Sequence, residues 1–173
     1  MFGVSVFLGD ELTSETKNYL QTMKDSGFEG VFSSMHIPED DVSQYVTRVK
    51  TLGQWTQELD MQLMIDISGE ALNKIGFSFD RPEEMLAIGI TGLRMDYHRT
   101  NQVSAKVSRS MTVALNASTI TQADIDELKQ YNANFQQMEA WHNYYPRPET
   151  GLDKKLFIHK NHWLKSLGFN VMA

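Results

Sequence analysis

The sequence predicts an α/β protein with a parallel sheet of the TIM-type (β/α) barrel kind. Short apolar runs alternate with helical patterns along the whole chain, as expected for parallel strands joined by crossover helices. Several of these runs end in acidic, amide or hydroxyl residues, as barrel strands do at their functional edge. The competing architecture is a doubly wound open sheet, but the chain has neither a G-x-G-x-x-G nor a Walker A motif.

The first half of the chain contains three predicted strands and two predicted helices. The strands are residues 3–8, 28–33 and 62–67. The first helix follows residues 10–13 and ends at Gly27, because glycine readily adopts the left-handed conformation that closes a helix. The second helix opens at Pro38, whose missing N–H costs nothing in a first turn. Its apolar positions at helical spacing are Val42, Tyr45, Val46, Val49, Leu52 and Trp55.

The second half adds four predicted strands, at residues 92–97, 112–116, 134–141 and 169–172. A complete barrel has eight strand–helix units over about 250 residues. The sequence contains about seven predicted strands, whereas a complete barrel needs eight, so we predict an incomplete barrel. We expect a single domain over residues 1–173 that is truncated at its C-terminus.

Two helices are predicted between these later strands. Thr121 is expected to cap a helix that runs to Lys129, with Ile125 and Leu128 facing inward. The last predicted helix spans residues 153–167.

Composition places the chain among ordinary globular proteins. It has 173 residues, a formal net charge of -6 and 41% hydrophobic residues. No apolar run approaches the ~20 residues of a membrane span, and the first residues lack the pattern of a signal peptide. The absence of cysteine excludes disulfides and thiolate chemistry. We expect a cytoplasmic protein that binds neither membrane nor nucleic acid, since an acidic chain lacks a basic footprint; a homo-oligomer stays open.

Carboxylates stand near the ends of three predicted strands, at Asp66, Asp96 and Glu139, and Asn116 ends a fourth. The carboxyl ends of barrel strands converge on one mouth, so these side chains are expected to meet there. Paired carboxylates at such a mouth suit glycoside cleavage. One carboxyl group protonates the leaving oxygen, while the other attacks the anomeric carbon or activates water.

Each of these positions also has a structural interpretation. Asp66 could cap the following turn or helix through a backbone N–H, and Asp96 could form an ion pair with Arg94 on the same strand face. His142 and Asn143 could simply satisfy loop backbone groups. The other histidines show no metal-ligand spacing, so no metal site is predicted.

The stretch MEAWHNYYPRPETGLD, residues 138–153, is unusually rich in polar and rigid residues. Pro146 and Pro148 flank Arg147 and stiffen its backbone. A stiffened loop arginine suits a fixed contact with an anion. The aromatic residues that could stack against a sugar ring are Trp141, Tyr144 and Tyr145.

The residue types alone leave three functions open. The first is a glycoside hydrolase, and the second is a sugar-phosphate isomerase or epimerase, which also needs acids and bases in a barrel mouth. The third is a non-catalytic carbohydrate-binding or scaffold fragment. Activity on a monosaccharide would favour the second function, and binding without turnover would favour the third.

Four segments of the sequence resemble one bacterial family. They are HNYYPRPETGL (142–152), LRMDY (93–97), VALNAS (113–118) and GVSVFLG (3–9). On these segments the chain resembles the MupG-type 6-phospho-N-acetylmuramidases, over nearly its whole length. The resemblance implies an N-terminal (β/α) barrel followed by a smaller cyclophilin-like β domain. It also implies cofactor-free hydrolysis of N-acetylmuramic acid 6-phosphate–N-acetylglucosamine, a phosphorylated amino-sugar disaccharide, in cytoplasmic peptidoglycan recycling.

The resemblance implies a set of site residues as well. It places Asp66, Asp96 and Glu139 among the carboxylates at the mouth. The residues expected to line the substrate pocket are Asn116, His142, Asn143, Tyr145, Arg147 and Glu149. Chemistry and position favour Glu139 and Asp96 as the pair of acid/base and nucleophile, and Arg147 as a contact for the phosphate or the lactyl carboxylate.

Length is the departure from the family pattern. The last barrel unit and the β domain are expected to be absent from residues 1–173. Barrel phosphate sites often lie in the loops after the last two strands. The chain alone is therefore predicted to lack part of the phosphate cradle and to be inactive without it.

Overall fold

The computed structural model describes residues 1–34, 42–95, 103, 106–117, 120–131, 139–141 and 154–172. The chain divides into two compact units, Met1–Arg94 and Met95–Ala173. We call them the N-terminal unit and the C-terminal unit and describe each by itself.

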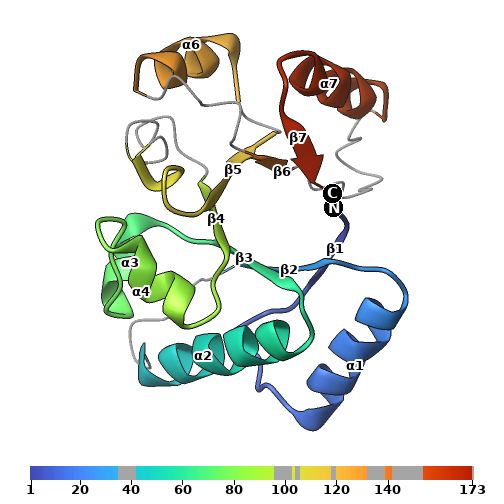
Figure 1. Ribbon diagram of the computed structural model, residues 1–173, viewed down its shortest axis with the longest axis vertical. Coiled ribbons are helices and arrows are strands. Elements are labelled where there is room, and N and C mark those ends of the chain that lie inside the picture. Colours follow the sequence, from blue (N-terminus) through green and yellow to red (C-terminus); the bar gives the residue numbers. More distant parts are fainter. Residues whose placement is uncertain are drawn as a thin grey trace. The chain divides into compact units, whose positions relative to one another are not determined.

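The N-terminal unit is built on four parallel strands that pair in the order of the sequence. They are β1 (Gly3–Ser5), β2 (Gly30–Ser34), β3 (Gln62–Asp66) and β4 (Gly92–Met95). The helices of this unit all lie on the same side of its strands (Figure 1). They are α1 (Ser14–Asp25), α2 (Val42–Glu58), α3 (Gly69–Lys74) and α4 (Pro82–Ala87). This is the strand–helix alternation that the sequence predicts for a parallel sheet.

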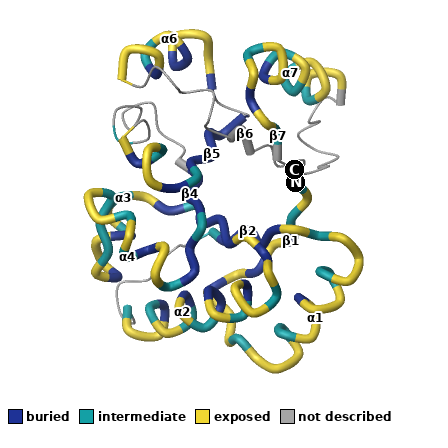
Figure 2. Tube along the Cα trace, in the orientation of Figure 1, coloured by how far each residue is buried: buried dark blue, intermediate teal, exposed yellow. Residues whose placement is uncertain are grey.

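The register sorts the side chains of these strands onto two faces. One face carries the aliphatic side chains of Val31, Leu63, Ile65 and Leu93, all fully buried, together with the buried hydroxyl of Ser33, which is level with Ile65. Successive residues of a strand point to opposite faces, so the other face carries Phe32 and Met64, which are level with each other. The strands of this unit run through its most buried part (Figure 2). Burial on both faces is typical of parallel sheets.

Helix α1 begins and ends as local chemistry requires. The Thr13 hydroxyl accepts a hydrogen bond from the Thr16 backbone N–H, and the Thr16 hydroxyl accepts one from Thr13 in return. At the other end Gly27 has a φ of 91°, in the left-handed region. The Phe28 N–H donates to the Met23 carbonyl at 3.0 Å, so Phe28 completes the helix end. Strand β2 therefore starts at Gly30, two residues later than the sequence predicts.

Helix α2 confirms the predicted apolar face. Tyr45, Val49 and Leu52 are buried, and the helix packs on β3. The described part of this helix begins at Val42. The predicted opening at Pro38 lies outside the described residues.

Two short helices between β3 and β4 were not predicted. Each has six residues, which is too short to show a 3.6-residue period. Their starts nevertheless follow local rules: Ser68 caps α3 by accepting from the Ala71 N–H at 3.2 Å, and Pro82 opens α4. Each anchors one fully buried side chain, Leu72 and Met85 respectively.

The C-terminal unit has three parallel strands, β5 (Thr112–Asn116), β6 (Glu139–Trp141) and β7 (Asn170–Met172), paired in that order. Helices α6 (Gln122–Tyr131) and α7 (Lys154–Ser166) lie between them in the chain (Figure 1). The strand–helix order agrees with the prediction. Residues 134–138 of the predicted sixth strand lie outside the described residues.

Helix α6 confirms its predicted cap and inward face. The Asp124 carboxylate accepts from the Thr121 N–H at 2.8 Å and from the Thr121 hydroxyl at 2.6 Å. The Asp124 N–H donates back to the Thr121 hydroxyl at 3.3 Å. Ile125 and Leu128 are fully buried. The start of α6 is thus fixed by two side chains three residues apart.

We expect Thr121→Ala to lower the free energy of unfolding by about 1 kcal/mol, the usual cost of a lost N-cap. The variant removes a hydroxyl that both donates to and accepts from Asp124. Urea unfolding followed by circular dichroism measures the change. Gln130→Ala, at an exposed position of the same helix, is the matched control and should stay within about 0.5 kcal/mol of the wild type. An equal change in both variants would contradict the capping role.

Candidate functional site

The carboxyl-terminal edge of the sheet in the N-terminal unit carries a row of polar residues. Ser34, Asp66 and Arg94 are level in the strand register, so they share one face. Asp66 ends β3, and Arg94 is the third of the four residues of β4. Arg94 Nη1 donates to Asp66 Oδ2 at 2.9 Å. The side chains of Arg94 and Asp66 are only 10% and 20% exposed.

Burial makes this ion pair informative. Arginine and aspartate are rarely buried unless paired, because leaving water costs each charge several kcal/mol. The strand residues before the pair on β3 and β4 are mainly apolar, and Leu63, Met64, Ile65 and Leu93 are buried. A neighbouring guanidinium favours the charged form of a carboxylate. Asp66 therefore suits the role of a base, nucleophile or positioning group better than that of a proton donor.

One of the two structural interpretations of these residues can now be compared with the geometry. The cap of the helix after β3 is Ser68, so the helix does not depend on Asp66 for its N-cap. An ion pair between Arg94 and Asp96 was the other structural interpretation and is not tested, while the described partner of Arg94 is Asp66 on the neighbouring strand β3. Asp96 itself lies outside the described residues. Sequence reasoning assigned Arg94 no functional role.

In the C-terminal unit, Asn116 and Glu139 lie on neighbouring parallel strands. Asn116 is level with Trp141, while Glu139 is level with Ala114, two residues earlier on β5. Asn116 is the last residue of β5 and is 9% exposed. The backbone register thus puts Asn116 and Glu139 on the same face of the strand pair, at positions two residues apart.

Ile120, four residues after Asn116, is held by hydrogen bonds at both of its backbone groups. The Ile120 N–H donates to the Asn116 carbonyl at 3.0 Å. The ammonium group of Lys160, on α7, donates to the Ile120 carbonyl and lies 4.8 Å from the centre of the Trp163 ring. Burial lowers the pKa of Lys160, and the negative charge of Asp124 opposes that shift. These contacts hold the backbone of Ile120 close to the end of β5.

Six predicted site residues cannot be compared with the structure. Asp96, His142, Asn143, Tyr145, Arg147 and Glu149 lie outside the described residues. Of the predicted set, the structure describes the side chains of Asp66 and Asn116 and the backbone of Glu139. It brings Asp66 to Arg94 within one unit, and Asn116 and Glu139 to adjacent strands of the other.

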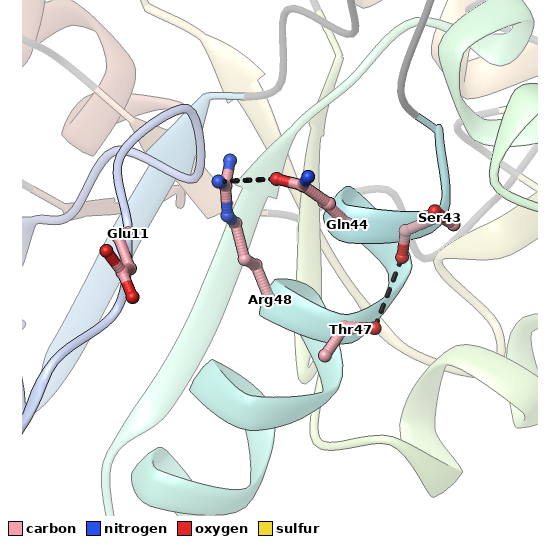
Figure 3. Close-up of a pocket in the computed structure, with 5 residues that line it drawn as sticks. All are labelled: Glu11, Ser43, Gln44, Thr47 and Arg48. Atoms are coloured by element: carbon pink, nitrogen blue, oxygen red, sulfur yellow. Dashed lines mark hydrogen bonds between the residues drawn. The ribbon is translucent and has the colours of Figure 1, made fainter.

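A hollow of about 390 Å³ also lies in the N-terminal unit, between the loop after β1 and the first turns of α2 (Figure 3). Its lining residues are Glu11, Ser43, Gln44, Thr47 and Arg48. Arg48 donates to the backbone carbonyls of Leu8 and Gly9, at 3.1 and 2.9 Å, and to the side chain of Gln44 at 2.9 Å. Arg48 therefore anchors the loop after β1 to α2.

The described residues show neither a metal site nor a membrane-spanning helix. No group of three or more histidine, aspartate or glutamate side chains among them is placed to hold a metal ion. No described helix combines the length and the apolar character that a membrane crossing requires.

Comparison with known families gives one decisive match. The sequence model of the family described as 6-phospho-N-acetylmuramidase, N-terminal, matches residues 2–173. The chain belongs to this family. The resemblance found in four short segments is thereby confirmed over the whole chain. Comparison with curated proteins gave no match.

Two solved structures are similar to the family member described here. One is a conserved protein of unknown function from Enterococcus faecalis, with 50% identity and a TM-score of 0.89, covering 99% of this chain and 47% of that one. The other is an uncharacterised B. cereus protein, with 20% identity and a TM-score of 0.77, covering 98% and 46%. The chain thus spans about half the length of these solved relatives.

More distant structures share only the fold. The tryptophan synthase alpha chain from Legionella pneumophila aligns with a TM-score of 0.65 at 10% identity, over 99% of this chain and 69% of that one. A mandelate racemase/muconate lactonizing protein from Paracoccus denitrificans aligns with a TM-score of 0.53, also at 10% identity, over 99% and 46%. These neighbours are TIM-barrel-like, in agreement with the α/β class and the parallel strands described here.

Arg94 is the residue that sequence reasoning missed as a possible site residue. The sequence does contain a signal for the pairing of Arg94 with Asp66. Asp66 is the fifth residue of its predicted strand and Arg94 the third of the next, and both strands are otherwise mainly apolar. Opposite charges on consecutive predicted parallel strands are compatible with a lateral ion pair, since such strands pair side by side.

Proposed function

We propose that this family member is a glycoside hydrolase that cleaves 6-phospho-N-acetylmuramyl-N-acetylglucosamine. The observation that carries the proposal is the family match over residues 2–173. The named activity supplies the substrate class, a phosphorylated amino-sugar disaccharide. Acidic and amide residues at the ends of parallel strands are compatible with it, since barrel enzymes build their sites there.

The fold proposed for this activity is a TIM-type (β/α) barrel, to which the seven described strands would all contribute. Its support is the parallel pairing within each unit and the likeness to TIM-barrel-like structures. That the barrel is incomplete, and that a smaller β domain is missing from residues 1–173, stay predictions from the sequence.

Glu139 and Asp96 are the proposed catalytic pair. One carboxyl group would protonate the glycosidic oxygen, while the other would attack the anomeric carbon or activate water. Supporting this choice, Glu139 begins β6 on the face it shares with Asn116. The proposed pocket residues are Asn116, His142, Asn143, Tyr145, Arg147 and Glu149.

The proposed setting is peptidoglycan recycling in the cytoplasm, without a cofactor. Hydrolysis of a glycoside needs only water, an acid and a base or nucleophile. The activity of the whole protein remains part of this proposal, because the chain spans about half the length of its solved relatives.

The proposed function predicts release of N-acetylglucosamine from N-acetylmuramic acid 6-phosphate–N-acetylglucosamine. The assay compares this chain with the full-length E. faecalis relative, which is 50% identical over the shared region. We expect release by the relative and weaker or no release by the chain alone, in line with the prediction of an incomplete phosphate cradle.

The control substrate for this assay is the same disaccharide without phosphate, which should be cleaved far more slowly. Failure of both folded proteins to cleave the phosphorylated disaccharide would refute the glycosidase proposal. Conversion of a sugar-phosphate monosaccharide instead would identify an isomerase or epimerase. Binding of the disaccharide without any turnover would identify a carbohydrate-binding module.

A further inference from the structure

We infer that Arg94 binds an anionic substituent of the sugar substrate, and that Asp66 positions Arg94 for this contact. The inference rests on the proposed function, because it takes the substrate class from there. It gives Asp66 the role of a positioning residue in place of a catalytic one. Asp66 and Arg94 both lie within the N-terminal unit, and the structure describes both side chains.

The position of the pair is the first argument. Asp66 and Arg94 are level in the register at the carboxyl-terminal edge of β3 and β4. Ligands of parallel α/β sheets bind at this edge of the strands. The opposite face of the same strands carries buried hydrocarbon, from Leu63, Ile65 and Leu93. The ion pair lies on the other face, beyond the buried side chains of Phe32 and Met64 and at the carboxyl-terminal end of the strands.

The energetics of the pair are the second argument. A largely buried ion pair is often no more stabilising than two well-packed apolar side chains, because desolvation cancels most of the attraction. Arg94 and Asp66 keep 10% and 20% exposure respectively, so they bear the desolvation cost but are not sealed from a ligand. A charged pair at this place is consistent with a need to present a fixed positive charge at the edge of the sheet.

The chemistry of arginine is the third argument. A guanidinium carries five N–H donors in a planar fork, which allows one arginine to contact a carboxylate and a substrate anion together. The 2.9 Å contact from Nη1 to Asp66 Oδ2 fixes the orientation of this fork. A preorganised cation loses little side-chain entropy when a ligand binds. Phosphate and carboxylate are the two anions that arginine recognises best.

The proposed substrate offers one anion of each kind, the 6-phosphate and the lactyl carboxylate. Four monosaccharides distinguish binding of the phosphate from binding of the carboxylate. N-acetylmuramic acid 6-phosphate carries both anions, N-acetylmuramic acid only the carboxylate, N-acetylglucosamine 6-phosphate only the phosphate, and N-acetylglucosamine neither. Their dissociation constants, measured by calorimetry or ligand-observed NMR, report on Arg94 without requiring turnover.

The main variant is Arg94→Met, measured on the same chain as the wild type. Arg94 is expected to bind either the phosphate or the carboxylate. We expect the affinity of the two ligands that carry this anion to fall about 10- to 100-fold, since a hydrogen bond to a charged group is lost. Affinity for ligands that lack that anion should stay unchanged. The anion shared by the ligands whose affinity falls is the substituent that Arg94 binds. Equal loss for all four ligands, or no loss for any, would overturn the inference, as would absence of binding by the folded wild type.

Two further variants guard against misfolding. Arg94→Lys keeps the charge but not the fork, so it should retain part of the same anion preference. The double variant Asp66→Asn with Arg94→Gln removes both charges, which avoids an unpaired buried carboxylate, and should lose the preference as Arg94→Met does. The matched control is Arg81→Met, because Arg81 lies in the same unit and pairs with Glu84 at the surface. It changes the net charge equally and should leave all four affinities unchanged.

The role of Asp66 is tested by Asp66→Asn. If Asp66 is a positioning residue, this substitution should weaken binding of the same anionic ligands by the chain. In the full-length E. faecalis relative, the equivalent substitution should raise KM for the disaccharide and change kcat less than about 10-fold. A kcat lowered 100-fold or more at unchanged ligand affinity would show a catalytic carboxylate and overturn the assignment. The binding and cleavage results are separable. Cleavage without an Arg94-dependent anion preference refutes the inference alone, and an Arg94-dependent preference without cleavage refutes the glycosidase alone.

Discussion

Gly53→Ala is expected to lower the free energy of unfolding by about 3 kcal/mol, or to prevent folding, although it places a better helix former inside α2. A Cβ atom at position 53 would lie 1.9 Å from the carbonyl oxygen of Ile88 and 3.3 Å from the Cα of Gly89. Both neighbours are backbone atoms, so no side chain can rotate away. Overpacking of this kind costs about 1–3 kcal/mol or more, whereas the gain in helix propensity is at most about 1 kcal/mol.

Two other substitutions separate the sources of this effect. Gly89→Ala should be similarly destabilising, because its Cβ would lie 2.5 Å from the Gly53 carbonyl oxygen and its φ is 90°. Gly76→Ala has a similar φ of 85° but no atom within 4 Å of the added Cβ, so it should show only the strain of about 1–2 kcal/mol. Urea unfolding of the three variants provides the comparison. A stable Gly53→Ala variant would contradict the close approach of α2 to the residues that end α4.

Glu139→Gln is expected to lower kcat for the disaccharide by about 10²–10⁴-fold, the usual contribution of a general acid or base. Glutamine keeps the size of glutamate but cannot transfer a proton. The position of Glu139, on β6 beside β5 and on the face shared with Asn116, supports a place for it in the site. The test uses steady-state kinetics of the full-length E. faecalis relative with the equivalent substitution, beside the chain itself.

The choice of leaving group distinguishes the roles that Glu139 could have. A 4-nitrophenyl glycoside of the same sugar phosphate needs little protonation of its leaving oxygen. If Glu139 is the acid, the variant should recover much of its activity on that substrate; if it is the nucleophile, the loss should stay equally large. Asn116→Ala serves as a comparison that removes a polar side chain from the same strand pair without removing a titrating group. Unchanged kcat in Glu139→Gln on both substrates would remove Glu139 from the proposed mechanism.

Local sequence rules explain most of the elements that were predicted. The buried face of α2, including Val49 and Leu52, follows from helical periodicity over 17 residues. The cap at Thr121 and the stop at Gly27 depend on neighbours within a few residues. These features depend on contacts between residues that are close in the sequence, so they can be predicted from the sequence directly. The six-residue helices α3 and α4 were missed because they are too short to display a period.

For the candidate site, the sequence predicted a position at one edge of the sheet and not the contacts within it. Carboxylates near strand ends indicated which edge of the sheet to consider, and Asp66 is indeed the last residue of β3. The partner of Asp66 was missed, because the pairing joins residues 28 positions apart through the register of two strands. A shift of one residue would place the two side chains on opposite faces. No pattern within either strand alone fixes that register.

The sequence by itself determined the order of the strands and of the longer helices, the stop of α1, the cap of α6, and the family of the chain. Each of these depends on residue types at short or fixed spacings. Only the tertiary structure decided that Arg94 lies against Asp66, and that the backbone of Gly53 meets that of Ile88 and Gly89. Both contacts join segments that are distant in the chain. Their existence depends on how strands pair and how a helix packs, which are properties of the folded arrangement and of no single segment.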